Sequence, residues 1–390
     1  MSFLRLCLFI IIPFNVYATT NPEVDREEIY YQNLNTFEMR VYEFICRGKS
    51  ISCEEQKNIY IQALVEYKND HPKVNVEDIN LRPFSALQKL RLIRELELKN
   101  SVSLGASKAS SDAKKYYCHE RDYFNQLGIY IDGDCTKKKT TIITDVRIFK
   151  DLFFGKTELE KYYRGHYQKG VKLYQFCRQD RGYACLIVMK DKDNNPLRTS
   201  DGELLARPSL AYSKYRKPYY QTDGHTPMGI FEINSVMPKA NKYLRYGKFR
   251  RLILHRVNKS KNFKNNKLLL PKAHHNLNWW KQADEAYDNG RGMFRIHGTG
   301  YSNSDPEFDT YFPFTPTRGC VAQREGNFQW DNESASYVDQ DVLLNILMRA
   351  QGLDVIYDNH VQIKGLLYVI EIDNKKRPVN LTDLHNLGIQ

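Results

Sequence analysis

The sequence has 390 residues, of which 42% are hydrophobic, so it is long enough to bury the cores of about two or three domains. Its formal net charge of +12 indicates an anionic partner, and the hydrophobic content argues against a disordered chain. No apolar run after the N-terminus approaches the length of a membrane span.

The N-terminal segment, residues 1–18, has the pattern of a secretory signal peptide. Arg5 precedes an apolar run over residues 6–12, and the segment ends in a small-x-small step at Ala18. The alternative is a membrane anchor, but this run is too short to cross about 30 Å of hydrocarbon. We therefore expect cleavage after Ala18 and an exported chain without stable membrane insertion. Export argues against nucleic acid and favours cell-wall polymers or anionic lipid headgroups as the anionic partner.

The cysteines fall into three close couples and one isolated residue. The chain has 8 Cys, and Cys7 leaves with the signal peptide. Six cysteines allow 15 pairings, and neighbour pairing is the simplest because each couple brackets a short polar loop. Cys320 is left as a free thiol, which is either a buried filler or a reactive group. The predicted disulfides are Cys46–Cys53, Cys118–Cys135 and Cys177–Cys185.

The first part of the mature chain is predicted to be helical, over residues 19–100. Apolar residues recur at helical spacing over residues 29–44, and again at Phe84, Leu87, Leu90, Ile93 and Leu96. Both stripes predict core faces of a small helical domain. Residues 101–115 are rich in Ser, Ala, Lys and Gly and are expected to form a linker. An intermediate domain or extension is expected over residues 116–170.

The remaining chain is predicted to be mostly strand. The β-branched and aromatic runs "TTIITDVRIF", "GVKLYQF" and "ACLIVMKD" are separated by turn signals, and "GLLYVIEID" reads as a last strand. Helices are expected over residues 278–289 and 339–351. The fold class is therefore α+β, with a mainly-β domain over residues 171–373 and a short C-terminal tail over 374–390.

A basic segment over residues 239–283 contains 13 Lys and Arg and no Asp or Glu. It is either a solvated loop or an electropositive flap over an anionic polymer. His274 and His275 lie at its end, with no carboxylate or Cys at ligand spacing, so we predict surface histidines and no metal site. Trp279 and Trp280 are expected on a half-buried amphipathic helix.

The segment "MFRIHGTGYSNSDPEFDTYFPFTPTRGCVAQRE" combines a thiol with a base. A cysteine needs a positioned base to become a thiolate near neutral pH, and His297, at a predicted strand end, can supply one. Gly319 allows a tight turn that aims backbone N–H groups at an oxyanion. Arg318 would favour the thiolate and attract carboxylates. The pattern predicts acyl transfer, although a Cys–His pair at this spacing is a weak signal by itself.

These motifs resemble the L,D-transpeptidases of the YkuD type, whose signature is His-Gly, a spacer and Ser/Thr-x-Gly-Cys. Here it reads His297-Gly298 and Thr317-Arg318-Gly319-Cys320. Upstream, "DGHTPMGIFEI" is similar to the family's Thr-Pro-x-Gly segment, and "FRRLILHRV" to the strand that follows it. The likeness covers roughly residues 171–373.

The resemblance implies a β-sandwich catalytic domain that acts on peptidoglycan stem peptides in the periplasm, without a cofactor. Cys320 would be the nucleophile and His297 the general base, with the Gly298 carbonyl orienting the imidazole. Gly319 and Cys320 N–H groups would form the oxyanion hole, and Thr317 and Arg318 would line the donor site. The spacer after His297 is longer than usual, so residues 301–316 are expected to form an extra loop. Ala322 stands where the family often has Arg or Asn.

Three functions remain open on the sequence alone. The first is an L,D-transpeptidase with an amine acceptor, which is the commoner activity in the family. The second is an L,D-carboxypeptidase, in which water resolves the thioester. The third is a non-catalytic wall-binding protein, which gives no reason for the Cys–His pair. The sequence does not separate the first two, and it does not predict the oligomeric state.

Overall fold

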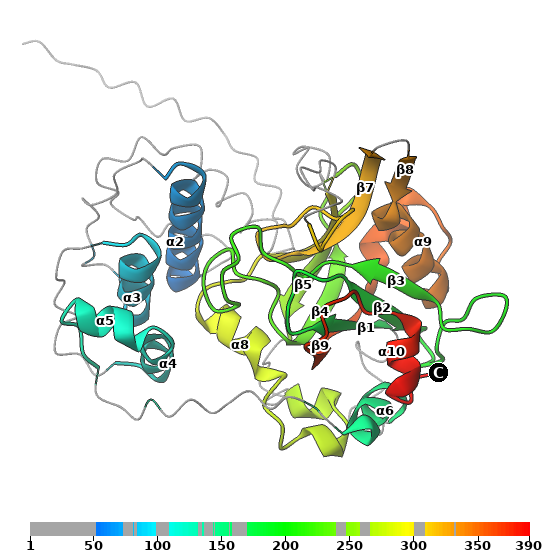
Figure 1. The fold of residues 1–390 in the computed structure, drawn as a ribbon, viewed down its shortest axis with the longest axis horizontal. Coiled ribbons are helices and arrows are strands. Elements are labelled where there is room, and N and C mark those ends of the chain that lie inside the picture. Colours follow the sequence, from blue (N-terminus) through cyan, green and yellow to red (C-terminus); the bar gives the residue numbers. More distant parts are fainter. Residues whose placement is uncertain are drawn as a thin grey trace, which may run out of the picture.

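The structure is a computed structural model (Figure 1). It describes residues 52–72, 81, 84–98, 109–131, 135, 143, 145–155, 157, 170–238, 247–257, 266–299, 309–330 and 333–390. The predicted signal peptide, the helical stripe over residues 29–44 and Cys46 lie outside these ranges. Among the helices within them, none is long and apolar enough to cross a membrane.

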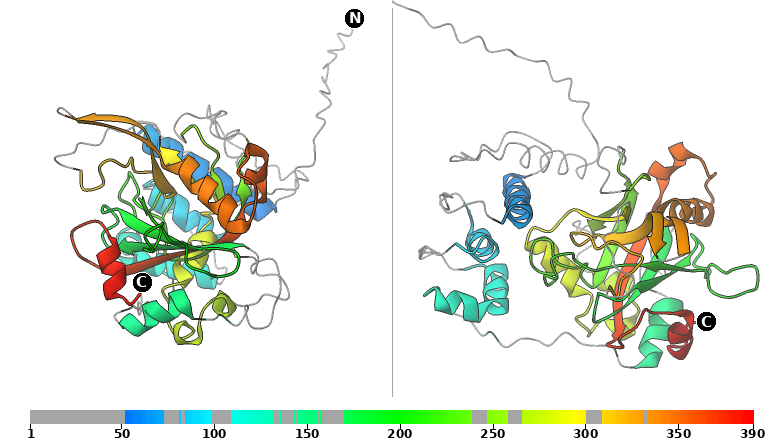
Figure 2. Two further views of the ribbon diagram at one scale, coloured as in Figure 1. Left: turned by 90° about the vertical axis from the view of Figure 1, so that its right-hand side faces the viewer. Right: turned by 45° about the horizontal axis from the view of Figure 1, so that its top comes forward.

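Four helices group together on one side of the strands (Figures 1 and 2). Serine caps explain where three of them begin. At one of these, the Ser85 hydroxyl accepts from the Gln88 N–H while the Gln88 side chain accepts from the Ser85 N–H. Of the predicted stripe, Phe84, Leu90, Ile93 and Leu96 are buried in their shared hydrophobic cluster, and Leu87 packs against it. The helices are α2 (Cys53–Asp70), α3 (Ala86–Glu95), α4 (Ser111–His119) and α5 (Arg121–Gln126).

The segment expected as a linker includes the start of a helix. Residues 111–115 belong to α4, because the Ser110 hydroxyl accepts from the Ala113 N–H (3.1 Å) and caps the helix. Ala113 and Tyr116 then bury one face of α4 in the helical cluster. Small polar residues suggested a linker by composition, whereas a cap followed by buried residues at helical spacing makes the same residues a helix.

Nine strands are hydrogen-bonded as one continuous mixed sheet, in the order β3-β2-β1-β9-β4-β5-β6-β7-β8. The pairs β1/β9 and β6/β7 are parallel, and the other neighbours are antiparallel. The sequence predicts a β-sandwich, in which two sheets pack face to face. The described strands instead form this one sheet, and helices cover both of its faces. The strands are β1 (Val171–Arg178), β2 (Cys185–Lys190), β3 (Ala206–Ser209), β4 (Gly229–Val236), β5 (Leu252–Arg256), β6 (Phe294–Thr299), β7 (Val321–Trp330), β8 (Glu333–Val338) and β9 (Lys364–Asp373).

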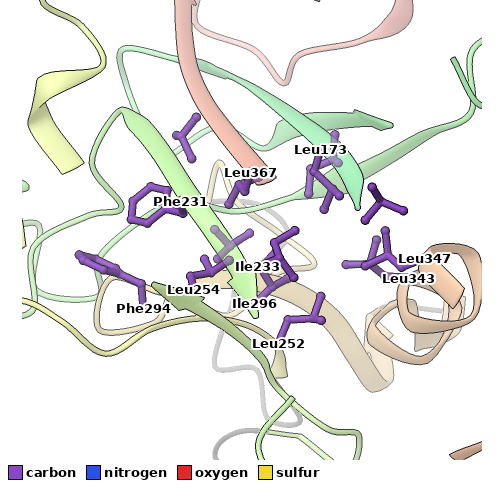
Figure 3. Close-up of a cluster of buried hydrophobic side chains, with 14 of the residues drawn as sticks. Leu173, Phe231, Ile233, Leu252, Leu254, Phe294, Ile296, Leu343, Leu347 and Leu367 are labelled. Atoms are coloured by element: carbon purple, nitrogen blue, oxygen red, sulfur yellow. The ribbon is translucent and has the colours of Figure 1, made fainter. Parts of the chain in front are cut away.

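Successive residues of the central strands point to opposite faces, so each face has its own core. On one face, Leu173, Phe231 and Leu367 pack against Leu343 and Leu347 of α9 (Asp339–Gln351), which has the predicted bounds (Figure 3). The other face is covered by α6 (Val146–Phe154), the 3-10 helix η3 (Asn266–Leu269) and α10 (Leu381–Asn386). Figure 2 shows α9 on one side of the sheet and α6 and α10 on the other.

The run predicted as a strand over residues 140–149 is wrong in its second half, which begins α6. Asp145 caps this helix by accepting from the Arg147 N–H (2.9 Å). Phe149, Leu152 and Phe153 recur at helical spacing and are buried against the sheet. β-branched residues alone therefore misled the prediction, because the apolar period decides between strand and helix.

The predictions for the end of the basic segment are partly wrong. His274, expected at the surface, is fully buried: its Nε2 lies 3.0 Å from the Ile148 carbonyl oxygen, and its Nδ1 accepts from Trp279 Nε1 (3.3 Å). It belongs to the 3-10 helix η4 (Lys272–His274). The two tryptophans are buried just before α8 (Lys281–Asp288), the helix predicted over residues 278–289. Packing under α6 makes His274 a core residue.

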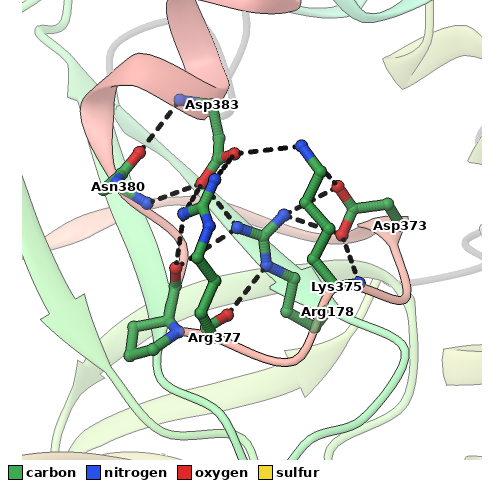
Figure 4. A network of polar contacts seen from close by, with 7 residues as sticks. Arg178, Asp373, Lys375, Arg377, Asn380 and Asp383 are labelled. Carbon is green, nitrogen blue, oxygen red and sulfur yellow. Dashed lines mark hydrogen bonds and ion pairs between the residues drawn. The ribbon is translucent and has the colours of Figure 1, made fainter.

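The C-terminal segment, expected as a tail, packs back onto the domain. Arg178 donates to Asp373 (2.7 Å) and Asp383 (2.5 Å), and Arg377 donates to Asp383 as well (Figure 4). The Asn380 side chain caps α10 through the Asp383 N–H (3.0 Å). This network joins the ends of β1 and β9 to α10. A further 3-10 helix, η5 (Tyr357–Gln362), precedes β9.

Disulfides join Cys118 to Cys135 and Cys177 to Cys185, the pairing predicted for these four residues. Cys53 is also disulfide-bonded, and its predicted partner Cys46 lies outside the described residues. We expect peptide mass mapping without reduction to find Cys46–Cys53 with the other two pairs, and Cys320 as the thiol that iodoacetamide labels. A disulfide at Cys320 in the active protein would contradict both the pairing and the role proposed below for this thiol.

Candidate active site

The predicted nucleophile, Cys320, lies in a turn immediately before β7 and is partly exposed. The Thr317 hydroxyl fixes this turn: it donates to the Cys320 carbonyl (2.6 Å) and accepts from the Gly319 N–H (3.2 Å). Thr226, from the "DGHTPMG" segment, donates its hydroxyl to the Gly319 carbonyl (2.9 Å). The Gly319 N–H, one of the two predicted oxyanion donors, is therefore bonded to Thr317.

Gly319 is required at this turn for two reasons. Its φ is +104°, in the left-handed region that side chains disfavour. A Cβ here would lie 2.3 Å from both the Gly224 carbonyl oxygen and Arg291 Nη2. Arg291, a residue that sequence reasoning missed, is buried behind the turn and donates to the carbonyl oxygens of Tyr219, Gly224 and His225. Arg291 thus holds the loop against which the Gly319 turn rests.

The predicted base, His297, is buried in β6, and its Nδ1 lies 2.7 Å from the Gly298 carbonyl oxygen. A carbonyl oxygen can only accept, so Nδ1 carries the proton and Nε2 is the basic nitrogen. This contact has the geometry expected for the Gly298 carbonyl as the group that orients the imidazole. There is no room for a side chain at residue 298, because a Cβ on Gly298 would overlap the Glu325 carboxyl.

The strand register places the thiol and the imidazole on one face of the sheet. In the parallel pair β6/β7, Ile296 is opposite Val321 and His297 is opposite Ala322. Ile296 and Val321 point into the hydrophobic core. His297 and Cys320, each one residue away, therefore point to the other face, where they are diagonal neighbours on adjacent strands. Cys320 Sγ lies 3.8 Å from the Met293 carbonyl oxygen, which also places it beside the start of β6.

The thiol is protonated in this structure at neutral pH. Burial raises the pKa of Cys320 to about 11, and the negative charge of Glu66 raises it further. The positive charges of Arg295 and Arg251 act in the opposite direction. A thiol with this pKa needs a base to become a nucleophile near neutral pH.

Two ionisable residues of the "DGHTPMG" segment, His225 and Asp223, have pKa values shifted by burial. Burial and the charges of Arg181 and Arg291 lower the pKa of His225 to about 3, so its imidazole is neutral, and its Nδ1 lies 3.1 Å from the Lys217 carbonyl oxygen. Burial, together with the charge of Glu66, raises the pKa of Asp223 well above its ordinary value. An imidazole with this pKa is not poised to exchange protons near pH 7, so His225 is not a candidate base.

Arg318, predicted to line the donor site, is bound by carboxylates of helix α2. Its Nη1 donates to Glu66 (2.5 Å) and its Nη2 donates to Asp70. The same end of α2 contacts the "DGHTPMG" segment, because Asn69 Nδ2 donates to the Asp223 carboxyl (2.8 Å). The side chain expected to attract substrate carboxylates is therefore already paired with carboxylates of this chain.

Helix α3 contacts the same loop. The Thr222 N–H donates to the Glu95 carboxyl (2.9 Å), and Arg91 donates to the Thr222 hydroxyl (3.0 Å). Sequence reasoning missed these contacts, because more than a hundred residues separate their partners. The helices α2 and α3 consequently border the candidate site.

A pocket opens between α2 and the chain that enters β6. The carbonyl oxygen of its lining residue Met293 lies 3.8 Å from Cys320 Sγ, and neither Cys320 nor His297 is among the residues that line the pocket. Its lining is mixed polar and apolar. The α2 residues that line it are Glu55, Asn58, Ile59 and Gln62, and those from the sheet side are Tyr287, Gly290, Gly292 and Met293.

Removing the α2 carboxylates is expected to make Cys320 more reactive. In the double variant Glu66→Gln with Asp70→Asn, the negative charge that raises the thiol pKa is gone and Arg318 is released. The pKa of Cys320 should fall, so iodoacetamide should label it several-fold faster at pH 8. The matched control is Glu54→Gln, an exposed carboxylate in the first turn of α2. Equal labelling of all three proteins would contradict this electrostatic coupling.

Residues 187–332 match the family model of the YkuD L,D-transpeptidase catalytic domain. The matched segment includes most of β2, all of β3 to β7, the Gly319–Cys320 turn and His297, and it falls within the range predicted from the sequence. No curated protein and no solved structure matches the chain. The class that this match supports is that of peptidoglycan-modifying enzymes. The resemblance recognised from the sequence motifs is confirmed for residues 187–332, the segment that matches the YkuD L,D-transpeptidase catalytic domain.

Proposed function

We propose that this protein is an exported, cysteine-dependent L,D-transpeptidase that acts on peptidoglycan stem peptides in the periplasm. The observation that carries the proposal is the placement of Cys320 and His297 on one sheet face within the segment that matches the family. The net charge of +12 suits a wall polymer that bears free carboxylates. We also propose that the helices before residue 131 form an N-terminal domain that borders the active site.

In the proposed acylation, His297 Nε2 takes the thiol proton from Cys320, and the thiolate attacks the carbonyl carbon of the L-centre of a diaminoacyl residue. The negative charge on the carbonyl oxygen is stabilised by the Cys320 backbone N–H, because the Gly319 N–H is bonded to the Thr317 hydroxyl. The C–N bond then breaks, the imidazolium returns its proton to the leaving amine, and a terminal D-alanine departs. A thioester to Cys320 remains.

In the second half, the amine of another stem peptide attacks the thioester carbon. His297 accepts a proton from this amine and returns it to the thiol as the C–S bond breaks, which regenerates Cys320. Such positioned proton transfer contributes typically about 10²–10⁴-fold in rate.

The second candidate is an L,D-carboxypeptidase, in which water replaces the amine. The choice depends on how well the site admits an amine-bearing strand and excludes water. The test is mass analysis of muropeptides after incubation of the mature protein with tetrapeptide-containing sacculi. A dimer cross-linked between two diaminoacyl residues indicates transpeptidation, and tripeptides alone indicate carboxypeptidase action. Unchanged tetrapeptides would overturn both activities and leave the wall-binding alternative.

A further inference from the structure

Two buried arginines lie beside the proposed nucleophile. Arg251 and Arg295 are each only 2% exposed, and the mechanism above assigns them no part. A guanidinium stays charged at any physiological pH, and removing it from water costs several kcal/mol unless charge and hydrogen bonds compensate. Arg295 Nη1 donates to the Phe294 carbonyl oxygen (2.7 Å). The strand register shows on which face of the sheet the two guanidiniums lie.

The strand register places both arginines on the catalytic face of the sheet. In the antiparallel pair β5/β6, Leu252 is opposite Ile296, so the next residue outward, Arg251, comes opposite His297. Leu252 and Ile296 point into the hydrophobic core (Figure 3). Arg251 therefore points to the same side as His297, because directly opposed residues share a face.

Arg295 shares this face because it lies two residues before His297 in the same strand. In the parallel pair β6/β7, Ile296 is opposite Val321, so Cys320 comes opposite Arg295. One face of three adjacent strand segments thus carries Arg251, His297, Arg295 and Cys320 together.

The charges of these arginines reach the thiol. Both lower the pKa of Cys320, and the Arg295 backbone N–H adds a hydrogen bond with the same effect. Arg318, the cation that sequence reasoning favoured, is instead held by Glu66 and Asp70 of α2. In this structure, Arg251 and Arg295 are thus cations whose fields favour negative charge at Cys320, in addition to Arg291 behind the turn.

We propose that Arg251 and Arg295 form the subsite that holds a carboxylate of the acyl donor next to Cys320. This assignment rests on the proposed function, in which the leaving D-amino acid carries its carboxylate one residue beyond the attacked carbonyl. Arginine suits this task because its planar guanidinium can bind a carboxylate through two parallel hydrogen bonds. The subsite favours donors that end in a free carboxylate over donors whose terminus is amidated.

The test compares two alkylating reagents that differ in charge. Iodoacetate carries a carboxylate and iodoacetamide a neutral amide, and both transfer the same carbon to the Cys320 thiolate with loss of iodide. Both reagents react with the same thiolate, so a change in the thiolate fraction alters both rates equally. The ratio of the two rates therefore reports the electrostatic field at the thiol. In Arg251→Gln and in Arg295→Gln we expect this ratio to fall about tenfold, as for the loss of one nearby cation in a partly buried site.

Three controls keep the test sharp. Arg251→Lys and Arg295→Lys keep the charge and should retain most of the ratio. Arg250→Gln removes the neighbouring cation, which stacks on Tyr357 (3.6 Å) away from the site, and should leave the ratio unchanged. The iodoacetamide rate itself shows whether each variant still presents a folded thiol pocket.

An unchanged ratio in both glutamine variants would overturn the subsite. The ratio needs no turnover, so it can fall even if the protein proves not to cut stem peptides, and the two proposals therefore fail separately. Where turnover is found, the same variants should lose their preference for a free over an amidated donor terminus. A preference that survives in both variants would also overturn the assignment.

Discussion

Cys320→Ala is expected to abolish turnover of tetrapeptide sacculi while the fold persists. Without Sγ no thioester can form, and a neighbouring side chain cannot replace the nucleophile in its strand register. The substitution removes one sulfur from a partly exposed site, so it should cost no more than about 1–2 kcal/mol of stability. Muropeptide mass analysis measures the first effect, and thermal unfolding measures the second.

A carbapenem gives an independent readout of the same thiol. The Cys320 thiolate should open the β-lactam ring, so that the intact protein gains the mass of one carbapenem, and Cys320→Ala should gain none. An alanine variant that folds and still converts tetrapeptides would end the assignment of Cys320 as nucleophile. Sacculi incubated without protein control for spontaneous hydrolysis.

The features that the sequence predicted are those encoded by neighbouring residues. The apolar stripe of α3 and its capping pair Ser85 and Gln88 are local, and so are the bounds of α9. The Gly319–Cys320 turn was predictable because a glycine before a lone cysteine in a recognisable motif restricts the backbone. α6 was missed in part because its β-branched beginning resembles a strand, and only its later residues reveal the helical period.

The features that sequence reasoning missed depend on contacts between distant segments. Glu66 and Asp70 meet Arg318 across about 250 residues, and no local pattern marks such a pair. Arg251 and Arg295 both stand inside motifs that were recognised, yet their meaning depends on register. Only the pairing of β5 with β6 and of β6 with β7 places them on the face of Cys320.

Gly319→Ala is expected to remove most activity and to destabilise the protein by about 2–5 kcal/mol. About 1–2 kcal/mol comes from the left-handed backbone at φ +104°, which an alanine disfavours. A further 1–3 kcal/mol, roughly, comes from forcing a methyl group 2.3 Å from the Gly224 carbonyl oxygen and Arg291. Relief of this overlap requires the turn to move, which displaces the Cys320 thiol and the backbone donors together.

Gly202→Ala separates the two contributions, because Gly202 has a similar backbone (φ +86°) but open space around its Cβ position. It should cost only the backbone strain and leave turnover unchanged, since its loop joins β2 to β3 away from the site. Chemical denaturation measures both stabilities, and the iodoacetamide rate at Cys320 reports whether the turn has moved. If both variants lost stability equally and kept wild-type labelling, the close contact among Gly319, Gly224 and Arg291 would not be what positions the nucleophile.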